Sequence, residues 1–308
     1  MNKYRFSHRA MATVFELIIN CPDQEYSEGM AGEIWKRIDI LENELSRYNP
    51  NSDISKINSL KIGERTTLSE HSFNCLEYSQ TLYDLTDGAF NIASGALYNC
   101  WLNPDKSLKN PTTAEIELAA QKSDISNIIL YDDYSVGIKK EGTVIDLGAF
   151  GKGYSIDVAY EMLKYWGIES AFLSAGQSSI RAFSNNNYSE GWDISISNQN
   201  NYDQKVYNCK LRNMSIGSSG LSKGNHIIDT KKMKPVEEKR GVWVFTGSAA
   251  EADALSTAFM ILDYDLIKTI LKCLENTGVI IIEPNQVTKV SDIVMLGEIG
   301  CDMNLLLA

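Results

Sequence analysis

The chain has 308 residues, which allows a sizeable core in one large domain or in two lobes. Hydrophobic residues make up 44% of the chain and charged residues 22%, values typical of a soluble globular protein. The formal net charge of −11 argues against a protein that holds nucleic acid on a broad basic surface. An acidic protein that binds phosphate needs local help, either from a metal ion or from backbone amides.

The amino-terminal sequence has basic residues but no continuous apolar stretch and no small-residue cleavage site, so it does not resemble a secretory signal. No apolar run approaches the length of a membrane span. We therefore expect a cytoplasmic protein with no membrane segment. The six cysteines form no CxxC pair and are expected to be reduced, mostly buried thiols.

Apolar residues at helical spacing and capping residues predict six helices. The first starts at Glu33 and stops at Asn49-Pro50, and the second is capped by Ser69 and ends at Asp87-Gly88. The third has a capping box at Thr112 and Glu115 and runs through Ala120. The other three are predicted over Tyr154–Trp166, Ala250–Leu262 and Asp265–Leu274. Leu45–Asn58 is a loop by composition. Gly88–Trp101 has no clear period, and it is compatible with a ligand-lining segment or with a connection packed on the core.

Runs of β-branched and alternating apolar residues predict the strands. They are Ala12–Ile19, Ile128–Tyr131, Val136–Ile138, Thr143–Ile145, Ser170–Leu173, Trp192–Ile196, Val206–Leu211, Val242–Phe245, Val279–Ile282 and Ile293–Leu296. No internal repeat or low-complexity linker marks a domain boundary, so we expect a single domain over residues 1–308, with two intertwined lobes as an alternative within it.

The stretch GTVIDLGAFGKGYSID at Gly142–Asp157 indicates a strand that leads through a glycine-rich turn into a helix. Gly148, Gly151 and Gly153 remove side chains from the turn, so backbone N–H groups could approach an anion at the positive end of the helix. The spacing matches neither the Walker A pattern nor the dinucleotide fingerprint. Glycine content alone is equally compatible with a tight structural turn.

The helix that starts near Ala250 carries Asp253, Ser256 and Thr257. Asp253 and Thr257 are four residues apart and share a helix face, and their oxygen atoms suit a hard cation such as Mg²⁺. The structural alternative is a helix start at which Asp253 favours the positive dipole end and Thr257 bonds its own backbone.

His226 is one of three histidines and lies between a Gly/Ser-rich loop and the sequence Ile227-Ile228-Asp229. A histidine near its unperturbed pKa can take a proton from a hydroxyl nucleophile, and a nearby carboxylate can orient its ring. A lone histidine at the start of a strand is more often structural.

Six motifs in the same order along the chain resemble the ApbE family of FAD:protein FMN transferases. They are MAT at Met11–Thr13 (family MGT), LSRYNPNSDISKIN at Leu45–Asn58 (LSRFxxxSxLxxLN), GAFN at Gly88–Asn91 (GAFD), DLGAFGKGYSID at Asp146–Asp157 (DLGGIAKGYAVD), NHIID at Asn225–Asp229 (HHIID) and EADALSTA at Glu251–Ala258 (ADALATA). The resemblance covers nearly the whole chain. It implies an α+β fold of mixed and antiparallel sheets with packed helices, in which two lobes enclose FAD.

The resemblance also implies an activity: Mg²⁺-dependent cleavage of FAD, transfer of FMN to a threonine hydroxyl of an acceptor flavoprotein, and release of AMP. The matching positions imply roles for single residues. The metal would be held by Ala149 through its carbonyl and by Asp253, Ser256 and Thr257; FAD would contact Met11, Ala89, Phe90, Asn91, Asp146 and Lys152; and His226 would be the base that activates the threonine.

Several positions depart from the family pattern. Ala12 replaces the glycine of MGT, Asn91 the aspartate of GAFD, and Gln177 the aspartate of a GGD turn, while the DPRTGYP loop becomes the more basic Asp229–Pro235. The leading hypothesis is therefore a flavin transferase. Two alternatives are a flavin-binding protein that has lost transfer, and a metal-dependent FAD pyrophosphatase that gives FMN and AMP.

Overall fold

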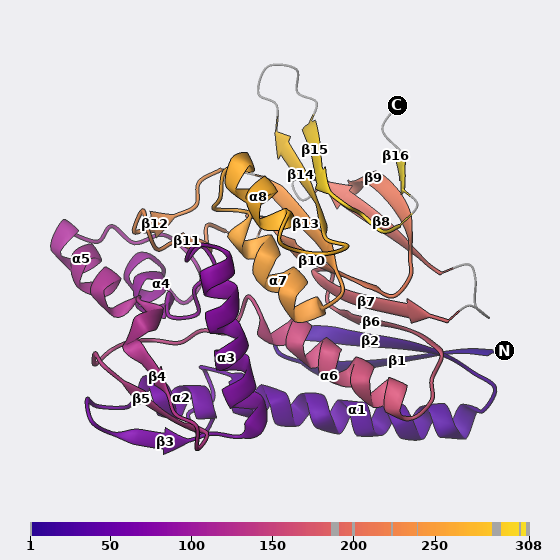
Figure 1. Cartoon of the computed structure of the whole chain (residues 1–308), viewed down its shortest axis with the longest axis horizontal. Coiled ribbons are helices and arrows are strands. Elements are labelled where there is room, and N and C mark those ends of the chain that lie inside the picture. The colour runs from indigo at the N-terminus through magenta and orange to yellow at the C-terminus, as the bar shows by residue number, and fades with distance from the viewer. Residues whose placement is uncertain are drawn as a thin grey trace.

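The computed structural model describes residues 2–185, 191–198, 201–222, 224–238, 240–284, 291–301 and 303–305 (Figure 1). Its largest element is an eight-stranded sheet in the order β1-β2-β6-β7-β10-β13-β14-β15. The strands are β1 (Asn2–Ala10), β2 (Thr13–Cys21), β6 (Ser170–Ala175), β7 (Ser179–Ser184), β10 (Met214–Ser219), β13 (Gly241–Thr246), β14 (Gly278–Pro284) and β15 (Ser291–Gly297). Every neighbouring pair in this sheet is antiparallel.

Three smaller sheets complete the β-structure. β3 (Arg65–Thr67), β5 (Ser135–Ile138) and β4 (Ile128–Leu130) form one; β16 (Met303–Leu305), β9 (Asn201–Leu211) and β8 (Trp192–Asn198) form another; β11 (Ile228–Asp229) and β12 (Lys234–Pro235) form a short hairpin. All of these pairs are antiparallel as well.

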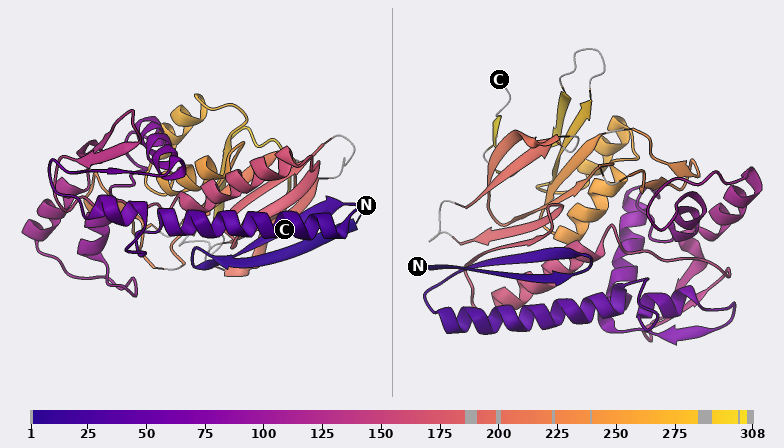
Figure 2. Two further views of the ribbon diagram at one scale, coloured as in Figure 1. Left: turned by 90° about the horizontal axis from the view of Figure 1, so that it is seen from below. Right: turned by 180° about the vertical axis from the view of Figure 1, so that it is seen from behind.

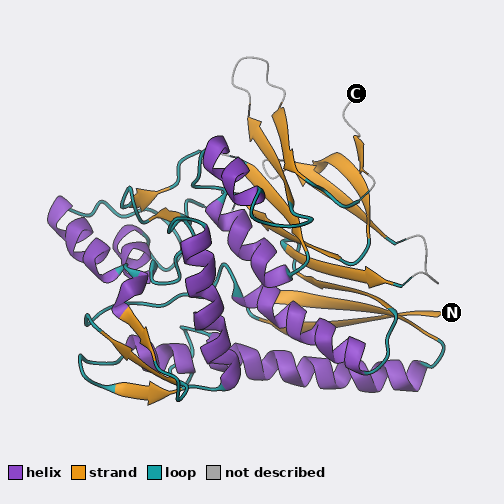
Figure 3. Cartoon of the chain, in the orientation of Figure 1, coloured by secondary structure: helices purple, strands orange, loops and turns teal. Residues whose placement is uncertain are grey.

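Eight α-helices and one 3₁₀ helix lie within the described ranges. They are α1 (Gln24–Leu45), α2 (Asp53–Asn58), α3 (Glu70–Leu85), α4 (Gly95–Trp101), α5 (Thr113–Lys122), the 3₁₀ helix η1 (Ile125–Asn127), α6 (Gly151–Tyr165), α7 (Ala249–Ala258) and α8 (Tyr264–Leu271). Helices α1, α6, α7 and α8 lie along the large sheet, whereas α2 to α5 and the β3-β5-β4 sheet gather beside its end (Figures 1 and 3). None of the helices in the described ranges is long and apolar enough to cross a membrane.

The central strands of the large sheet are buried on both faces because a helical layer covers one face and the β8–β9 hairpin covers the other (Figure 2). Successive side chains of a strand point to opposite faces. In β13, Val242 and Val244 accordingly belong to the core cluster on the helical side, while Trp243 and Phe245 belong to the cluster beneath β8 and β9. This arrangement explains the continuous apolar run of β13, which predicts a buried strand.

Many of the predicted elements are confirmed. Ser69 caps α3 by accepting from the N–H of Ser72, and Thr112 with Glu115 forms the capping box of α5. The α+β fold class with antiparallel sheets is confirmed too. The cysteines of the described chain are free thiols, but only three of the six are fully buried.

Other predictions were wrong. The strand predicted at Ala12–Ile19 exists as β2, but it is not the first strand, because β1 precedes it and forms nine residue pairs with it. The expected loop at Leu45–Asn58 contains α2, and Gly88–Trp101 contains α4. Thr143–Ile145 is not a strand of any sheet: Val144 makes one isolated parallel bridge to Ser94. The helix expected from Tyr154 begins earlier, at Gly151.

Candidate active site

Helix α7 is fixed at its start by a carboxylate from another helix. Asp157 of α6 accepts hydrogen bonds from the N–H groups of Ala249 and Ala250 at 2.9 Å each and from Ser248 Oγ at 2.7 Å. Arg181 of β7 donates to the same carboxylate at 2.6 Å. Since the first N–H groups of a helix have no partner within it, Asp157 satisfies the end of α7 and ties three elements together.

Two glycines allow α7 to approach its neighbours closely. A Cβ atom on Gly153 of α6 would lie 2.1 Å from the carbonyl oxygen of Ala249, and one on Gly217 of β10 would lie 2.1 Å from the carbonyl carbon of Ala252. Side chains at these positions would therefore collide with the backbone of α7. Gly153 thus has a packing role, whereas the sequence suggested either an open approach for an anion or a tight structural turn.

Asp253 is buried where α6, α7 and β7 meet. Its carboxylate accepts from Ser179 Oγ at 2.7 Å and from the N–H of Gly153 at 2.9 Å, and Lys152 Nζ lies 3.8 Å away. Burial raises the pKa of Asp253 to about 6, although Lys152 and the hydrogen bonds act in the opposite direction. Near neutral pH this carboxylate is therefore ionised but poorly solvated, a state that a bound cation would stabilise.

Three hydroxyl groups lie together one turn further along α7. Ser219 Oγ at the end of β10 is 2.8 Å from Ser256 Oγ and 3.1 Å from Thr257 Oγ1. Ser256 and Thr257 also donate to the carbonyl oxygen of Asp253, at 2.9 and 3.3 Å. Thr257 thus makes the bond to its own helix backbone that the structural alternative predicts. The same hydroxyl also belongs to the hydroxyl cluster.

These donors suit a magnesium ion better than a softer metal. They are a single carboxylate and several neutral oxygen atoms, and Mg²⁺ commonly takes one or two carboxylates and completes its shell with water and substrate phosphate. Within the described ranges no group of three His, Cys, Asp or Glu side chains gathers as a metal cluster. Ala149, the fourth expected ligand, lies next to Phe150, the N-cap of α6.

The N–H groups of the glycine-rich turn are used inside the protein. Gly148 donates to Asp146 Oδ1 at 2.8 Å, Phe150 and Gly151 donate to the carbonyl of Leu147, and Gly153 donates to Asp253. The expectation that these amides face a phosphate is therefore wrong for these four groups. The positive charge close to this turn comes from the side chains of Arg47 and Lys152.

Arg47 is one of these cations, and it comes from the stretch expected to be only a loop. Its Nη1 atom lies 3.3 Å from Asp146 Oδ2, and its side chain is 9% exposed. Asn58, at the other end of the same stretch, exchanges two hydrogen bonds with the backbone of Ile145, at 2.7 and 3.0 Å. The motif at Leu45–Asn58 and the segment Ile145-Asp146 that opens the glycine-rich turn thus pack together.

Other predicted flavin contacts line the same region of the fold. Ala89 and Phe90 are buried, and the Phe90 ring lies 6.2 Å from the ring of Phe150. Asn91 Nδ2 donates to the carbonyl of Ser123 at 2.9 Å and lies 3.5 Å from Thr230 Oγ1. The amide at position 91 therefore connects GAFN to the chain that follows NHIID.

Met11 is at the turn between β1 and β2. Met11 and Ala12 have positive φ angles of 50° and 56°, as both central residues of a two-residue type I′ hairpin require. Met11 Sδ lies 3.6 Å from Ser155 Oγ, so the turn contacts α6. The structure thus brings the MAT motif to the helix that follows the glycine-rich turn.

His226 precedes the β11–β12 hairpin. Its Nδ1 atom lies 2.7 Å from the carbonyl oxygen of Gly224. A carbonyl can only accept, so in the neutral ring Nδ1 carries the proton and Nε2 is the basic nitrogen. The ring is oriented by a backbone carbonyl, whereas Asp229, the carboxylate considered for this task, accepts from the N–H groups of Lys231 and Lys232.

Comparison with known proteins identifies the family. The model of the ApbE family matches residues 11–281. The chain belongs to the ApbE family. Its relatives include the FAD:protein FMN transferase of Buchnera aphidicola subsp. Schizaphis graminum (strain Sg), 28% identical over 265 residues, with 81% of this chain and 77% of the relative aligned. The enzyme of the same name from Escherichia coli (strain K12) is 22% identical over 280 residues, which are 86% of this chain and 80% of that protein.

Solved ApbE structures share the fold. The flavin transferase ApbE from Vibrio cholerae superposes with a TM-score of 0.83 at 21% identity, covering 96% of this chain and 97% of the other. The ApbE protein from Thermotoga maritima gives a TM-score of 0.84 at 22% identity, covering 96% and 97%. This ApbE chain therefore has the α+β architecture of the family over nearly its full length.

Four residues of this ApbE site were not selected from the sequence: Arg47, Asp157, Ser179 and Ser219. Arg47 and Asp157 lie inside family motifs but have no spacing that indicates their partners. Ser179 ends a turn of small residues, SAGQSS, which offered a weak signal. Ser219 lies in a serine-rich stretch of the sequence, and only the pairing of β10 in the sheet shows which of these serines reaches α7.

Proposed function

We propose that this chain is an FAD:protein FMN transferase. It would transfer FMN from FAD to a threonine hydroxyl of an acceptor flavoprotein through a phosphoester bond and release AMP. Membership of the ApbE family and the names of its relatives support a transferase that acts on FAD. The observation that carries the proposal is the buried Asp253 beside Lys152 and the hydroxyl cluster of Ser219, Ser256 and Thr257.

Asp253, Ser256, Thr257 and the carbonyl of Ala149 would hold Mg²⁺, which when bound stabilises negative charge on a pyrophosphate. The chain's own contribution is to keep these oxygen atoms in place. Ser179 and the N–H of Gly153 fix the carboxylate of Asp253, and the Asp157 cap fixes the helix that bears it. Lys152 adds a cation at the same place, which reduces the repulsion between an acidic protein and an anionic substrate.

His226 would remove the proton from the acceptor threonine. The bond from Nδ1 to the Gly224 carbonyl supports this role because it holds the tautomer whose Nε2 can accept a proton.

FAD would lie between two parts of one domain: the sheet with α6 and α7, and the part built from α2 to α5. Met11, Ala89, Phe90, Asn91, Asp146 and Lys152 would contact it. Support comes from the links between these segments, including the ion pair of Arg47 with Asp146 and the contact of Asn91 with Thr230. The cytoplasmic location and the single-domain organisation stay predictions.

The test incubates the protein with FAD, Mg²⁺ and an acceptor flavoprotein that an established ApbE enzyme labels. We expect covalent flavin on the acceptor, detected by in-gel fluorescence and by a mass increase of one FMN, with AMP as co-product. Chelation by EDTA and replacement of the acceptor threonine by alanine should each abolish labelling, and His226→Ala should abolish it while FAD binding remains.

Three results would contradict the proposal. No labelling under conditions in which the established enzyme works would exclude the transferase. FMN and AMP released at the same rate without acceptor would indicate a pyrophosphatase. Tight FAD binding without turnover, unaffected by His226→Ala, would indicate a flavin-binding protein.

A further inference from the structure

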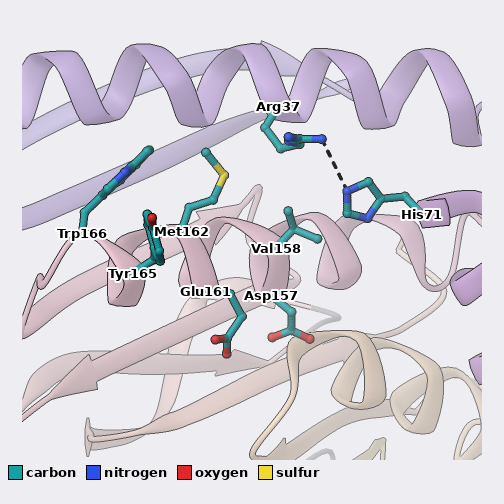
Figure 4. Close-up of a pocket in the computed structure, with 8 residues that line it drawn as sticks. All are labelled: Arg37, His71, Asp157, Val158, Glu161, Met162, Tyr165 and Trp166. Carbon is teal, nitrogen blue, oxygen red and sulfur yellow. Dashed lines mark hydrogen bonds between the residues drawn. The ribbon is translucent and has the colours of Figure 1, made fainter. Parts of the chain in front are cut away.

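An open, shallow cavity of about 620 Å³ lies between α1 and α6, and apart from Asp157 its lining residues have no role in the proposed function (Figure 4). One end is formed by Arg37 of α1 and His71 of α3, and the other by the last turns of α6. The side chains that carry the argument are Arg37, His71, Val158, Met162, Tyr165 and Trp166. The volume is of the size of small-molecule sites, roughly 300–1,000 Å³, and the cavity is open to solvent on one side.

The Arg37 end of the cavity carries a positive charge. Arg37 Nη1 approaches His71 Nε2 at 3.5 Å, and His71 Nδ1 lies 3.0 Å from the hydroxyl of Tyr154. Because a guanidinium can only donate, Nε2 of His71 is the acceptor and does not neutralise the charge. In the part of the chain that the structure describes, no carboxylate lies within ion-pair distance of Arg37.

The opposite end offers apolar and aromatic surface. Met162 lies in α6 and Trp166, four residues later, is its C-cap, so the two side chains lie on one side of the helix, with Val158 one turn before Met162. Tyr165 is 89% exposed, a large amount for an aromatic side chain. In Figure 4 Met162 and Trp166 extend toward α1, on the same side of α6 as Val158.

Two acids also border the cavity, but they have other partners. Asp157 binds Arg181 and the start of α7, and Glu161 lies 3.8 Å from Lys164. In Figure 4 both carboxylates extend from α6 away from α1, whereas Arg37 extends from α1 toward α6. The charge that faces the gap between the two helices is therefore that of Arg37.

We propose that this cavity is a binding site for an organic anion with an aromatic body, distinct from the proposed flavin site. The carboxylate or phosphate of the ligand pairs with Arg37, and its ring packs against Met162 and Trp166. A guanidinium suits either anion because its planar donors match both groups. The combination of one unpaired cation and an apolar floor selects this ligand class over neutral aromatics and over small inorganic anions.

The test uses isothermal titration calorimetry on the full chain with three probes: 2-naphthoate, 1-naphthyl phosphate and the neutral 2-naphthamide. We expect saturable binding of an anionic probe, with naphthamide much weaker, and a comparison of the two anions shows which headgroup is preferred. Arg37→Gln should weaken binding about tenfold or more, the loss typical of one charge-assisted hydrogen bond. Trp166→Leu should also weaken it.

The matched control is Arg5→Gln, which removes an exposed arginine of β1 and should leave binding unchanged. Saturating FAD should not displace the probe. The proposal is overturned if Arg37→Gln, shown to be folded by circular dichroism, binds like the wild type, if naphthamide binds as tightly as the anions, if FAD competes, or if no anionic probe gives saturable binding. None of these outcomes depends on transferase activity.

Discussion

Replacement of Gly153 by alanine tests the close contact between α6 and α7. The added Cβ would lie 2.1 Å from the carbonyl oxygen of Ala249 and 2.4 Å from its carbonyl carbon, whereas ordinary contacts begin at 3.4 Å. The helices would have to separate by roughly 1 Å, a shift resisted by the Asp157 cap and by the bond from the Gly153 N–H to Asp253.

Overpacking of this kind typically costs about 1–3 kcal/mol, and the obstacle here is backbone, which cannot rotate away. The same helix supplies the control, because a Cβ on Gly151 would have no atom within 4 Å outside its own helix. Gly151→Ala should then be neutral or stabilise the protein by up to about 1 kcal/mol through helix propensity.

The assay is urea unfolding of both variants followed by circular dichroism, with the free energy of unfolding extrapolated to water. We expect Gly153→Ala to unfold at a clearly lower urea concentration than Gly151→Ala, and to lose transferase activity because Asp253 moves with α7. Equal midpoints for the two variants would refute the steric argument, since both carry the same substitution in the same turn of α6.

The remaining predictions concern charge and backbone strain, each measured by urea unfolding. Because burial raises the pKa of Asp253 to about 6, the folded chain binds its proton more tightly than the unfolded chain. In EDTA the stability of the wild type should therefore fall relative to Asp253→Asn by about 2 kcal/mol as pH rises from about 4 to 7, and parallel pH profiles would contradict this. Asp157→Asn leaves Arg181 without its anion and should cost about 1–3 kcal/mol, so an unchanged midpoint would show that the ion pair is not stabilising. Ala12→Gly relieves a φ of 56° and should stabilise the protein by about 0.5–1 kcal/mol, whereas a loss of stability would mean that the turn is unstrained.

The sequence predicts best those elements whose pattern is local. The buried strand β13 and the capped helices α3 and α5 follow from apolar runs and capping residues that need no distant partner. β1 was not predicted because its apolar residues are only half-buried and the residues that alternate with them are mostly charged. This pattern is typical of a strand at the edge of a sheet.

The residues of the proposed site also divide into those with a local sequence pattern and those without one. Asp253, Ser256 and Thr257 share one helix, so their proximity could be predicted from their spacing alone. Ser179 and Ser219 could not be selected, because they reach α7 only through the pairing of β7 with β10, which aligns Ser179 with Gly217. A cap supplied by one helix to another, as Asp157 supplies to α7, has no local signature either.

The two sides of the proposed site differ in how firmly the fold holds them. Eight of the ten residues of α7 are buried, and the helix packs on α6, β7, β10 and β13. Its amide protons should exchange with solvent only when the whole unit opens. The β11–β12 hairpin after His226 has only two residue pairs between its strands and is otherwise anchored by single side-chain contacts such as that of Trp101 Nε1 with the Met233 carbonyl, so its amides should exchange through smaller openings than those of α7. The α7 oxygen atoms proposed to hold the metal are thus fixed by the fold in advance, whereas the segment of the proposed base His226 retains more freedom to adjust.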